Sequence, residues 1–168
     1  MAAADVQAIY LVFSGANVSV PIQTAVVARL HNPDTPVVLL TDRLHRPQVQ
    51  AAGLVFADLD AHSERYTALT EGYQQLTPTN GTGGGGEYTR FCWLRWRWLA
   101  AELAQRRLPL DAVVATMETD LLLYESVSGR YAEMRRERAE FEAFTLINGA
   151  YVVATHRALA AFADFQRW

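Results

Sequence analysis

Cysteine and long apolar runs are scarce in this sequence. Cys92 is the one cysteine among 168 residues, so no disulfide can form within the chain, which suits a reducing compartment. Residues 1–7 carry no positively charged segment, so the apolar stretch 8–13 is not the core of a signal peptide. No apolar run approaches the roughly 20 residues that span a bilayer. We therefore expect a cytoplasmic protein without a transmembrane segment.

Positive charge is also scarce, and two phosphate-binding patterns are missing. The formal net charge is −3, whereas nucleic-acid-binding domains carry a basic face, so we expect no nucleic-acid partner. The glycine-rich stretch 77–86 is followed by Glu87, not by the Lys-Ser or Lys-Thr of a P-loop, and is predicted to be a mobile surface loop. No Gly-x-Gly-x-x-Gly follows the first expected strand, which disfavours a nicotinamide-binding domain.

The length and composition are those of one globular domain. Apolar residues make up 51% and charged residues 20% of the chain. We expect residues 1–168 to form a single domain. Residues 158–168 have a helical pattern that does not end, so we expect a fragment or an abbreviated form of that domain.

The N-terminal third alternates between apolar runs and helical patterns. Strand-like runs at residues 8–13, 36–41 and 54–57 are separated by helical segments at 19–30 and 47–52. Ser19 is predicted to cap the first helix. This alternation predicts an α/β fold with a mostly parallel, Rossmann-like sheet flanked by helices.

The rest of the chain adds further elements. A long helix is predicted over residues 87–107, a buried strand over 112–117 and a charged helix over 129–141. Two short strands, 144–147 and 151–154, flank Asn148 and Gly149, a dipeptide typical of a hairpin turn. Thr155 is predicted to cap a last helix.

Two acidic side chains follow the strand 112–117. Because side chains alternate across a strand, Glu118 and Asp120 are expected to point the same way and Thr119 the other. Two carboxylates held together beside apolar runs repel each other and are costly to desolvate. A divalent cation would stabilise the pair, and Mg²⁺ needs only one or two carboxylates when substrate phosphates supply other ligands. The alternative is a strand-to-loop turn with two solvated acids.

Other strands of the predicted sheet also end at candidate site residues. The first strand ends at Phe13 and Ser14, and the second ends at Thr41 and Asp42. Ligands of open α/β sheets bind outside the carboxyl ends of the strands. Asp42 is predicted either to accept hydrogen bonds from a ribose or base, or to cap a turn or the following helix. Arg90, in the first turn of the long helix, is predicted either to face an anion or to be a plain surface arginine.

These motifs, in this order, resemble those of the GT-A class of nucleotide-sugar glycosyltransferases, in particular its family-8-type members. The resemblance covers nearly the whole chain. The segments that carry it are Phe13-Ser14, Leu39-Leu40-Thr41-Asp42, Glu87-Tyr88-Thr89-Arg90-Phe91, Met117-Glu118-Thr119-Asp120 and Leu146-Ile147-Asn148-Gly149.

The resemblance implies a hexosyltransferase-type enzyme that uses a nucleoside-diphosphate-sugar donor and an acceptor that the sequence does not identify. Glu118 and Asp120 would stand for the Asp-x-Asp motif, whose carboxylates hold Mn²⁺ or Mg²⁺ on the donor diphosphate. Arg90 would reach the donor, and Asn148 and Gly149 would line the sugar pocket. The donor site would be completed by Phe13, Ser14, Thr41 and Asp42.

The chain departs from this class in three ways, and two other functions are kept as alternatives. Glu118 replaces the usual Asp, the Asn-Gly segment lacks a spacer residue, and the sequence is expected to stop before the region where such enzymes commonly place a late metal-binding His and much of the acceptor site. No general base is identified. A truncated or degenerate GT-A-like domain would bind a sugar nucleotide or a partner without turnover. A sugar nucleotidyltransferase has a similar sheet, but such enzymes carry a basic, glycine-rich loop after the first strand, where residues 14–18 contain no Lys or Arg.

Overall fold

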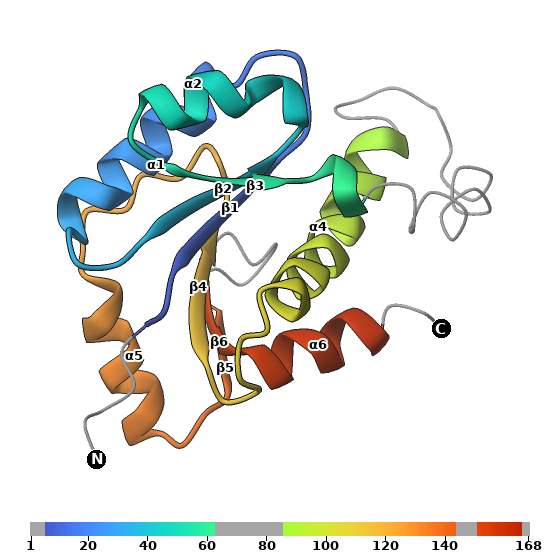
Figure 1. Ribbon diagram of the computed structural model, residues 1–168. Coiled ribbons are helices and arrows are strands. Elements are labelled where there is room, and N and C mark those ends of the chain that lie inside the picture. The colour runs from blue at the N-terminus through green and yellow to red at the C-terminus, as the bar shows by residue number, and fades with distance from the viewer. Residues whose placement is uncertain (1–5, 63–85, 144–150, 166–168) are drawn as a thin grey trace.

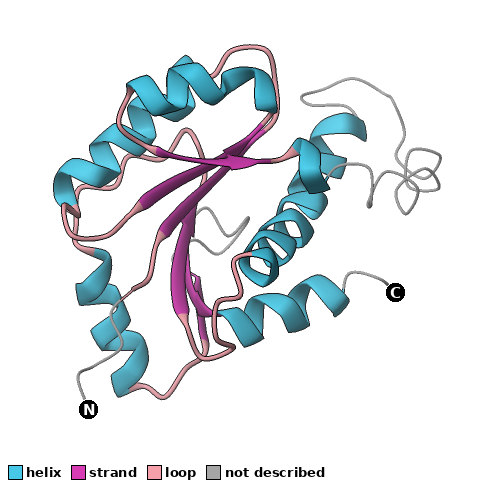
Figure 2. Cartoon of the chain, in the orientation of Figure 1, coloured by secondary structure: helices cyan, strands magenta, loops and turns pink. Residues whose placement is uncertain are grey.

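The computed structural model describes residues 6–62, 86–143 and 151–165, apart from the side chains of residues 86–90 and 93. In this part of the chain a six-stranded sheet is flanked by helices (Figure 1 and Figure 2). The strands are β1 Ile9–Phe13, β2 Val37–Thr41, β3 Val55–Asp58, β4 Val113–Met117, β5 Phe141–Ala143 and β6 Tyr151–Thr155. The helices are α1 Ser19–His31, the short 3₁₀ helix η1 Arg43–His45, α2 Arg46–Ala51, α4 Gly86–Gln105, α5 Val127–Arg136 and α6 His156–Phe165. The predicted α/β fold is confirmed.

The strand order is β3-β2-β1-β4-β6-β5. Strands β1 to β4 run parallel, while β6 pairs antiparallel with both β4 and β5. The register places Phe13 beside Thr41, Thr41 beside Asp58, and Met117 beside Leu11. Because parallel strands end at the same edge of a sheet, the predicted strand-end residues gather along one carboxyl edge.

Helices cover both faces of the sheet, which explains why its central strands are almost wholly apolar. Ile9 and Leu11 of β1 point to a core shared with α1, α2 and α5. Tyr10 and Val12 point to a second core, which contains Leu94, Trp96, Trp98, Leu99 and Leu103 of α4 and Leu159 of α6. Figure 1 shows these two groups of helices on opposite sides of the sheet.

The charged helix is shorter than the sequence pattern predicts. We expected a helix over residues 129–141, but α5 ends at Arg136 and Phe141 begins β5. Arg138 adopts a left-handed conformation with φ 56°, and the amide of Ala139 donates to the carbonyl of Met134 at 3.0 Å. This reversal ends the helix without the glycine that usually marks such a site.

The two predicted helix caps differ in outcome. The prediction for Ser19 is wrong, because Val18 occupies the N-cap position and Ser19 is already helical, with its amide donating to Oδ1 of Asn17 at 3.0 Å. The prediction for Thr155 is confirmed, because its Oγ1 accepts from the amide of Ala158 at 3.2 Å. The predicted strand 144–147 and the dipeptide Asn148-Gly149 lie outside the described residues.

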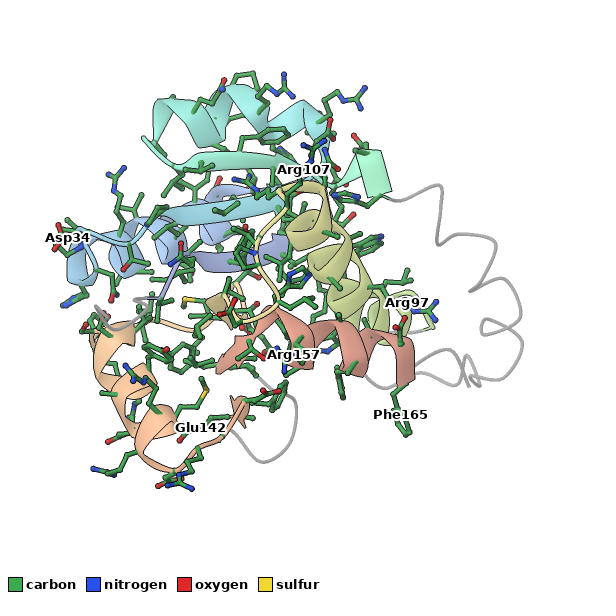
Figure 3. The ribbon with its side chains drawn as sticks, turned by 60° about the horizontal axis from the view of Figure 1, so that its bottom comes forward. Asp34, Arg97, Arg107, Glu142, Arg157 and Phe165 are labelled. Atoms are coloured by element: carbon green, nitrogen blue, oxygen red, sulfur yellow. The ribbon has the colours of Figure 1, made fainter. Side chains whose placement is uncertain are left out.

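The last helix ends in an exposed aromatic residue, and the helices have also been compared with the requirements for a membrane span. Phe165 extends from the last turn of α6 with 74% of its surface exposed (Figure 3). Among the helices that the structure describes, none combines the length and the hydropathy needed to cross a membrane.

Candidate functional site

A pocket of about 140 Å³ lies between α4 and the carboxyl ends of β1 and β4. The sheet lines it with Val12, Thr116 and Met117, helix α4 with Phe91, Cys92, Arg95, Trp96 and Leu99, and the turn after β4 with Glu118, Thr119 and Asp120. Pockets for drug-sized ligands measure about 300–1,000 Å³, so this one suits a compact charged group. The two predicted metal-binding acids therefore line the same pocket.

The turn that carries these acids is held from the opposite face of the sheet. Thr24 of α1 is buried, and its Oγ1 donates to the carbonyl of Thr119 at 2.7 Å. The amide of Leu121 reaches the carbonyl of Glu118 at 3.3 Å. These contacts constrain the backbone on both sides of Asp120.

Asn32 fixes the far end of the same segment. Its side chain is 4% exposed, and its Nδ2 donates to the carbonyls of Ala28 at 2.9 Å and Glu125 at 3.1 Å. Its Oδ1 accepts from the amide of Val127 at 2.8 Å, at the start of α5. Both polar atoms of this buried side chain are thus paired, through three hydrogen bonds, as burial requires.

Arg95 forms the main electrostatic contact of the pocket. Its Nη1 lies 2.7 Å from Oε1 of Glu118, and the two side chains are 12% and 16% exposed. Asp120, two residues further along, is exposed. The two acids therefore differ: Glu118 is already neutralised by a guanidinium, whereas Asp120 faces solvent at the rim.

A second group of predicted residues meets at the ends of β1 and β2. The carboxylate of Asp42 accepts from Oγ of Ser14 at 3.2 Å and from the amide of Gly15 at 2.9 Å. His45 is buried, and its Nε2 donates to the carbonyl of Gly15 at 2.7 Å, which assigns the proton to Nε2. Asp42 thus holds the loop after β1, in line with the turn-capping role weighed for it.

Phe13 and Thr41 are neighbours in this second group but face different surroundings. The Phe13 ring is half-buried, with its centroid 6.2 Å from that of His45. Thr41 is fully buried, and its Oγ1 has no hydrogen-bond partner within residues 6–62, 86–143 and 151–165. The side chain of Arg90 and all of Asn148 and Gly149 lie outside the part that the structure describes.

A further pair of acidic side chains, Asp58 and Asp60, lies at the end of β3 and is bound by Arg43. Nε of Arg43 lies 2.9 Å from Oδ2 of Asp58, and the amide of Arg43 donates to Oδ2 of Asp60 at 2.9 Å. The hydrogen bond to Asp58 raises the pKa of the Arg43 guanidinium. Asp58 and Asp60 have an Asp-x-Asp spacing that we did not single out from the sequence, and their contacts are those of a loop-stabilising cluster.

The pocket residues fit a divalent cation only as a partial ligand set. Within the described ranges, no group of three or more His, Cys, Asp or Glu side chains could hold a metal ion. Asp120 and Glu118 supply carboxylate oxygens, the ligands that Mg²⁺ prefers, and Mg²⁺ is commonly held by one or two carboxylates together with substrate phosphates. The donor set therefore suits a cation that is shared with a phosphate ligand.

From the sequence, Arg95 is expected to be solvated or paired with an acid, and the structure shows the pair; what the sequence reasoning missed is that Arg95 lines the pocket. A signal was present, because Phe91, Arg95 and Leu99 are spaced at i, i+4 and i+8 and so share one face of α4. An arginine between two apolar residues on a core-facing stripe needs a buried acid. Glu118 is that acid.

Comparisons with known proteins give the fold a context. No protein-family model matches the sequence, and comparison with curated proteins gives no significant match. Among solved structures, mouse xyloside xylosyltransferase 1 in its apo form is similar over 95% of this chain and 71% of its own, with a TM-score of 0.59 and 11% identity. The PaToxG glycosyltransferase is matched over 73% of this chain and 44% of its own, with a TM-score of 0.44 and 9% identity. The first likeness shows a mixed α/β fold similar to glycosyltransferase folds.

Proposed function

We propose that this chain is a single GT-A-type domain that transfers a sugar from a nucleoside-diphosphate-sugar donor. The observation that carries the proposal is the pocket in which Arg95, Glu118 and Asp120 meet at the carboxyl edge of the sheet. Ligands of open α/β sheets bind at this edge. The similarity to the fold of a xylosyltransferase supports the same reading.

In this proposal Asp120, with Glu118, holds Mn²⁺ or Mg²⁺. When bound, the cation neutralises charge that develops on the departing nucleoside diphosphate. Asp120 is at the exposed rim, so it is the primary ligand, and Glu118 joins it from deeper in the pocket. Arg95 contributes a positive charge on the α4 side of the same pocket. Arg90, Asn148 and Gly149 are proposed as further donor contacts on the strength of the resemblance.

The nucleoside end of the donor is proposed to lie at the ends of β1 and β2, where Phe13, Ser14, Thr41 and Asp42 gather. Asp42 accepts two hydrogen bonds within the protein, from Ser14 and Gly15. An ionised carboxylate offers about four acceptor sites, so two remain for a ribose or base. The loop contacts of Asp42 are therefore compatible with a role in binding.

Calorimetric titration tests this proposal. The wild-type protein is titrated with UDP and GDP, with and without Mn²⁺, and the titrations are repeated with Asp120→Ala. We expect metal-dependent binding that weakens at least about tenfold in the variant, since removing a metal-supporting group commonly costs 10–100-fold. The matched control is Asp34→Ala, because Asp34 is an exposed acid on the turn between α1 and β2 (Figure 3). Binding that ignores both the metal and Asp120 would contradict the proposal.

One observation favours the alternative of a domain that binds a sugar nucleotide without turnover. Glu118, the residue that departs from the Asp-x-Asp pattern, is already paired with Arg95. Incubation with UDP-glucose and UDP-xylose in the presence of Mn²⁺, followed by detection of released UDP, separates the two functions. Release of UDP supports the enzyme and compares hexosyl with pentosyl donors, whereas binding without release supports the non-catalytic domain.

A further inference from the structure

The pair between Arg95 and Glu118 occupies a place where two ligands of opposite charge are proposed to bind. It is a charge-assisted hydrogen bond of 2.7 Å within the lining of the pocket. Both side chains are mostly buried, at 12% and 16% exposure, so water solvates neither charge well. A charge in such a position needs a partner of opposite sign.

Each side chain of the pair has the charge of the ligand that the other side chain could bind. The guanidinium of arginine presents a planar fork of donors that matches carboxylate and phosphate oxygens alike. The carboxylate of Glu118 can accept from that fork or coordinate a hard cation. Glu118 thus occupies the position that a bound anion would take beside Arg95. Arg95 likewise occupies the position that a bound cation would take beside Glu118.

We propose that this ion pair is exchanged on binding: Glu118 turns to the divalent cation, and Arg95 turns to the diphosphate oxygens. This inference rests on the proposed function for the identity of the anion as a diphosphate. In the exchange one carboxylate and one guanidinium lose each other but gain a cation and an anion, so no charge in the pocket is left without a counterion. Arg95 is then a binding residue of the site, and the cation and the diphosphate bind with positive coupling.

The surroundings allow the exchange to be confined to side chains. The backbone of the turn is held by the hydrogen bond from Thr24 to the carbonyl of Thr119. Arg95 is in the middle of α4, whose apolar residues are packed against the sheet. The pocket of about 140 Å³ beside the pair gives both side chains room to turn. Asp120 is on the same turn and can bind the cation before and after the exchange.

The exchange predicts opposite responses to removal of the two charges. In Glu118→Gln, Arg95 loses its internal competitor, so inorganic pyrophosphate in a buffer with EDTA should bind about tenfold more tightly than to the wild type, within the usual range for coupled sites. In Arg95→Gln, Glu118 loses its guanidinium partner and can turn to a cation, so Mn²⁺ alone should bind about tenfold more tightly. Calorimetry measures the first affinity, and the electron paramagnetic resonance signal of free Mn²⁺ measures the second.

The controls separate the exchange from a purely structural pair. Glu125→Gln makes the same change in an exposed pair with Arg130, and should leave both affinities unchanged. The exchange is overturned if pyrophosphate binds folded Glu118→Gln no more tightly than wild type, or if Mn²⁺ binds folded Arg95→Gln no more tightly. If thermal unfolding shows that one variant does not fold, the reciprocal variant decides. Neither the pyrophosphate titration nor the Mn²⁺ titration contains a nucleotide. Failure of UDP to bind the wild type would therefore count against the proposed function and not against the exchange.

Discussion

Helix α4 takes part in two ion-pair contacts, one at the pocket and one further along the helix. The two contacts differ in how completely the carboxylate is paired. At the pocket, Arg95 contacts one oxygen of Glu118. Further along the helix, Oε2 of Glu102 lies 3.0 Å from Nε2 of His62, and its Oε1 accepts from Nε of Arg106. The side chains of His62 and Glu102 are only 7% and 6% exposed. Glu102 therefore has both oxygens engaged within the protein, whereas the side chain of Glu118 has one oxygen engaged by the residues that the structure describes, and it borders a pocket.

The difference distinguishes a group that holds the fold together from one available to a ligand. Burial raises the pKa of Glu102, but the hydrogen bonds from His62 and Arg106 outweigh burial and hold that pKa below its ordinary value of 4.5. A buried polar network that is fully satisfied stabilises one packing. By joining α4 to the residues after β3, Glu102 fixes the helix on which Arg95 is carried.

The largest expected effect comes from removing Glu102. Glu102→Ala removes the acceptor shared by the buried His62 and the exposed Arg106, so we expect the free energy of unfolding to fall by about 3 kcal/mol. Urea denaturation measures this loss. Glu118→Gln keeps a hydrogen-bond acceptor beside Arg95 and a pocket that water can enter, so its cost should be smaller, about 1.5 kcal/mol. Equal losses in the two variants would remove the distinction between the two contacts.

A smaller effect is expected from pH. Since the pKa of Glu102 is lower in the folded protein than its ordinary 4.5, the unfolded chain binds the proton more readily. The contribution of Glu102 to stability is therefore complete above pH 4.5 and is lost as the pH falls through the folded pKa. Urea denaturation between pH 3 and 6 should show wild-type stability falling more steeply below pH 4.5 than that of Glu102→Gln. Parallel curves would show that Glu102 does not titrate differently on folding.

The smallest effect is expected at the surface. Arg130 pairs with Glu125 at 2.8 Å and with Glu133 at 3.0 Å, but these acids are 45% and 43% exposed. Glu125→Gln should change the free energy of unfolding by no more than about 0.5 kcal/mol. The same denaturation measurement checks this. A loss comparable with that of Glu102→Ala would show that the exposure of an ion pair does not determine its contribution to the free energy of unfolding.

The fold was predictable because its signals are local. The apolar runs of β1, β2 and β4 and their alternation with helices predict a parallel sheet without knowledge of any contact. The end of α5 was not predictable, because Arg138 reverses the chain where no glycine marks the reversal. Helix boundaries that depend on one residue in an uncommon conformation leave little trace in composition.

The site was predictable only as far as strand ends fix it. Glu118, Asp120, Ser14 and Asp42 follow strands, so the sheet itself brings them to one edge. Arg95 comes from a helix whose rotation about its own axis is set by packing of its apolar residues, which spacing alone describes loosely. The pairing of Arg95 with Glu118 depends on how α4 lies across the sheet, and no motif in either segment specifies that angle.

The hydrogen bonds from α1 to the segment after β4 impose a constraint on chain length. Thr24 is in α1 and Asn32 is the residue that caps its C-terminus, and they bind the segment at residue 119 and again at 125 and 127. Residues 120–124 must span this distance, so a deletion there would break one attachment or displace Asp120. Substitutions are easier to accommodate than changes of length. The register of an acid at the pocket is thereby determined by a helix on the face of the sheet opposite to α4.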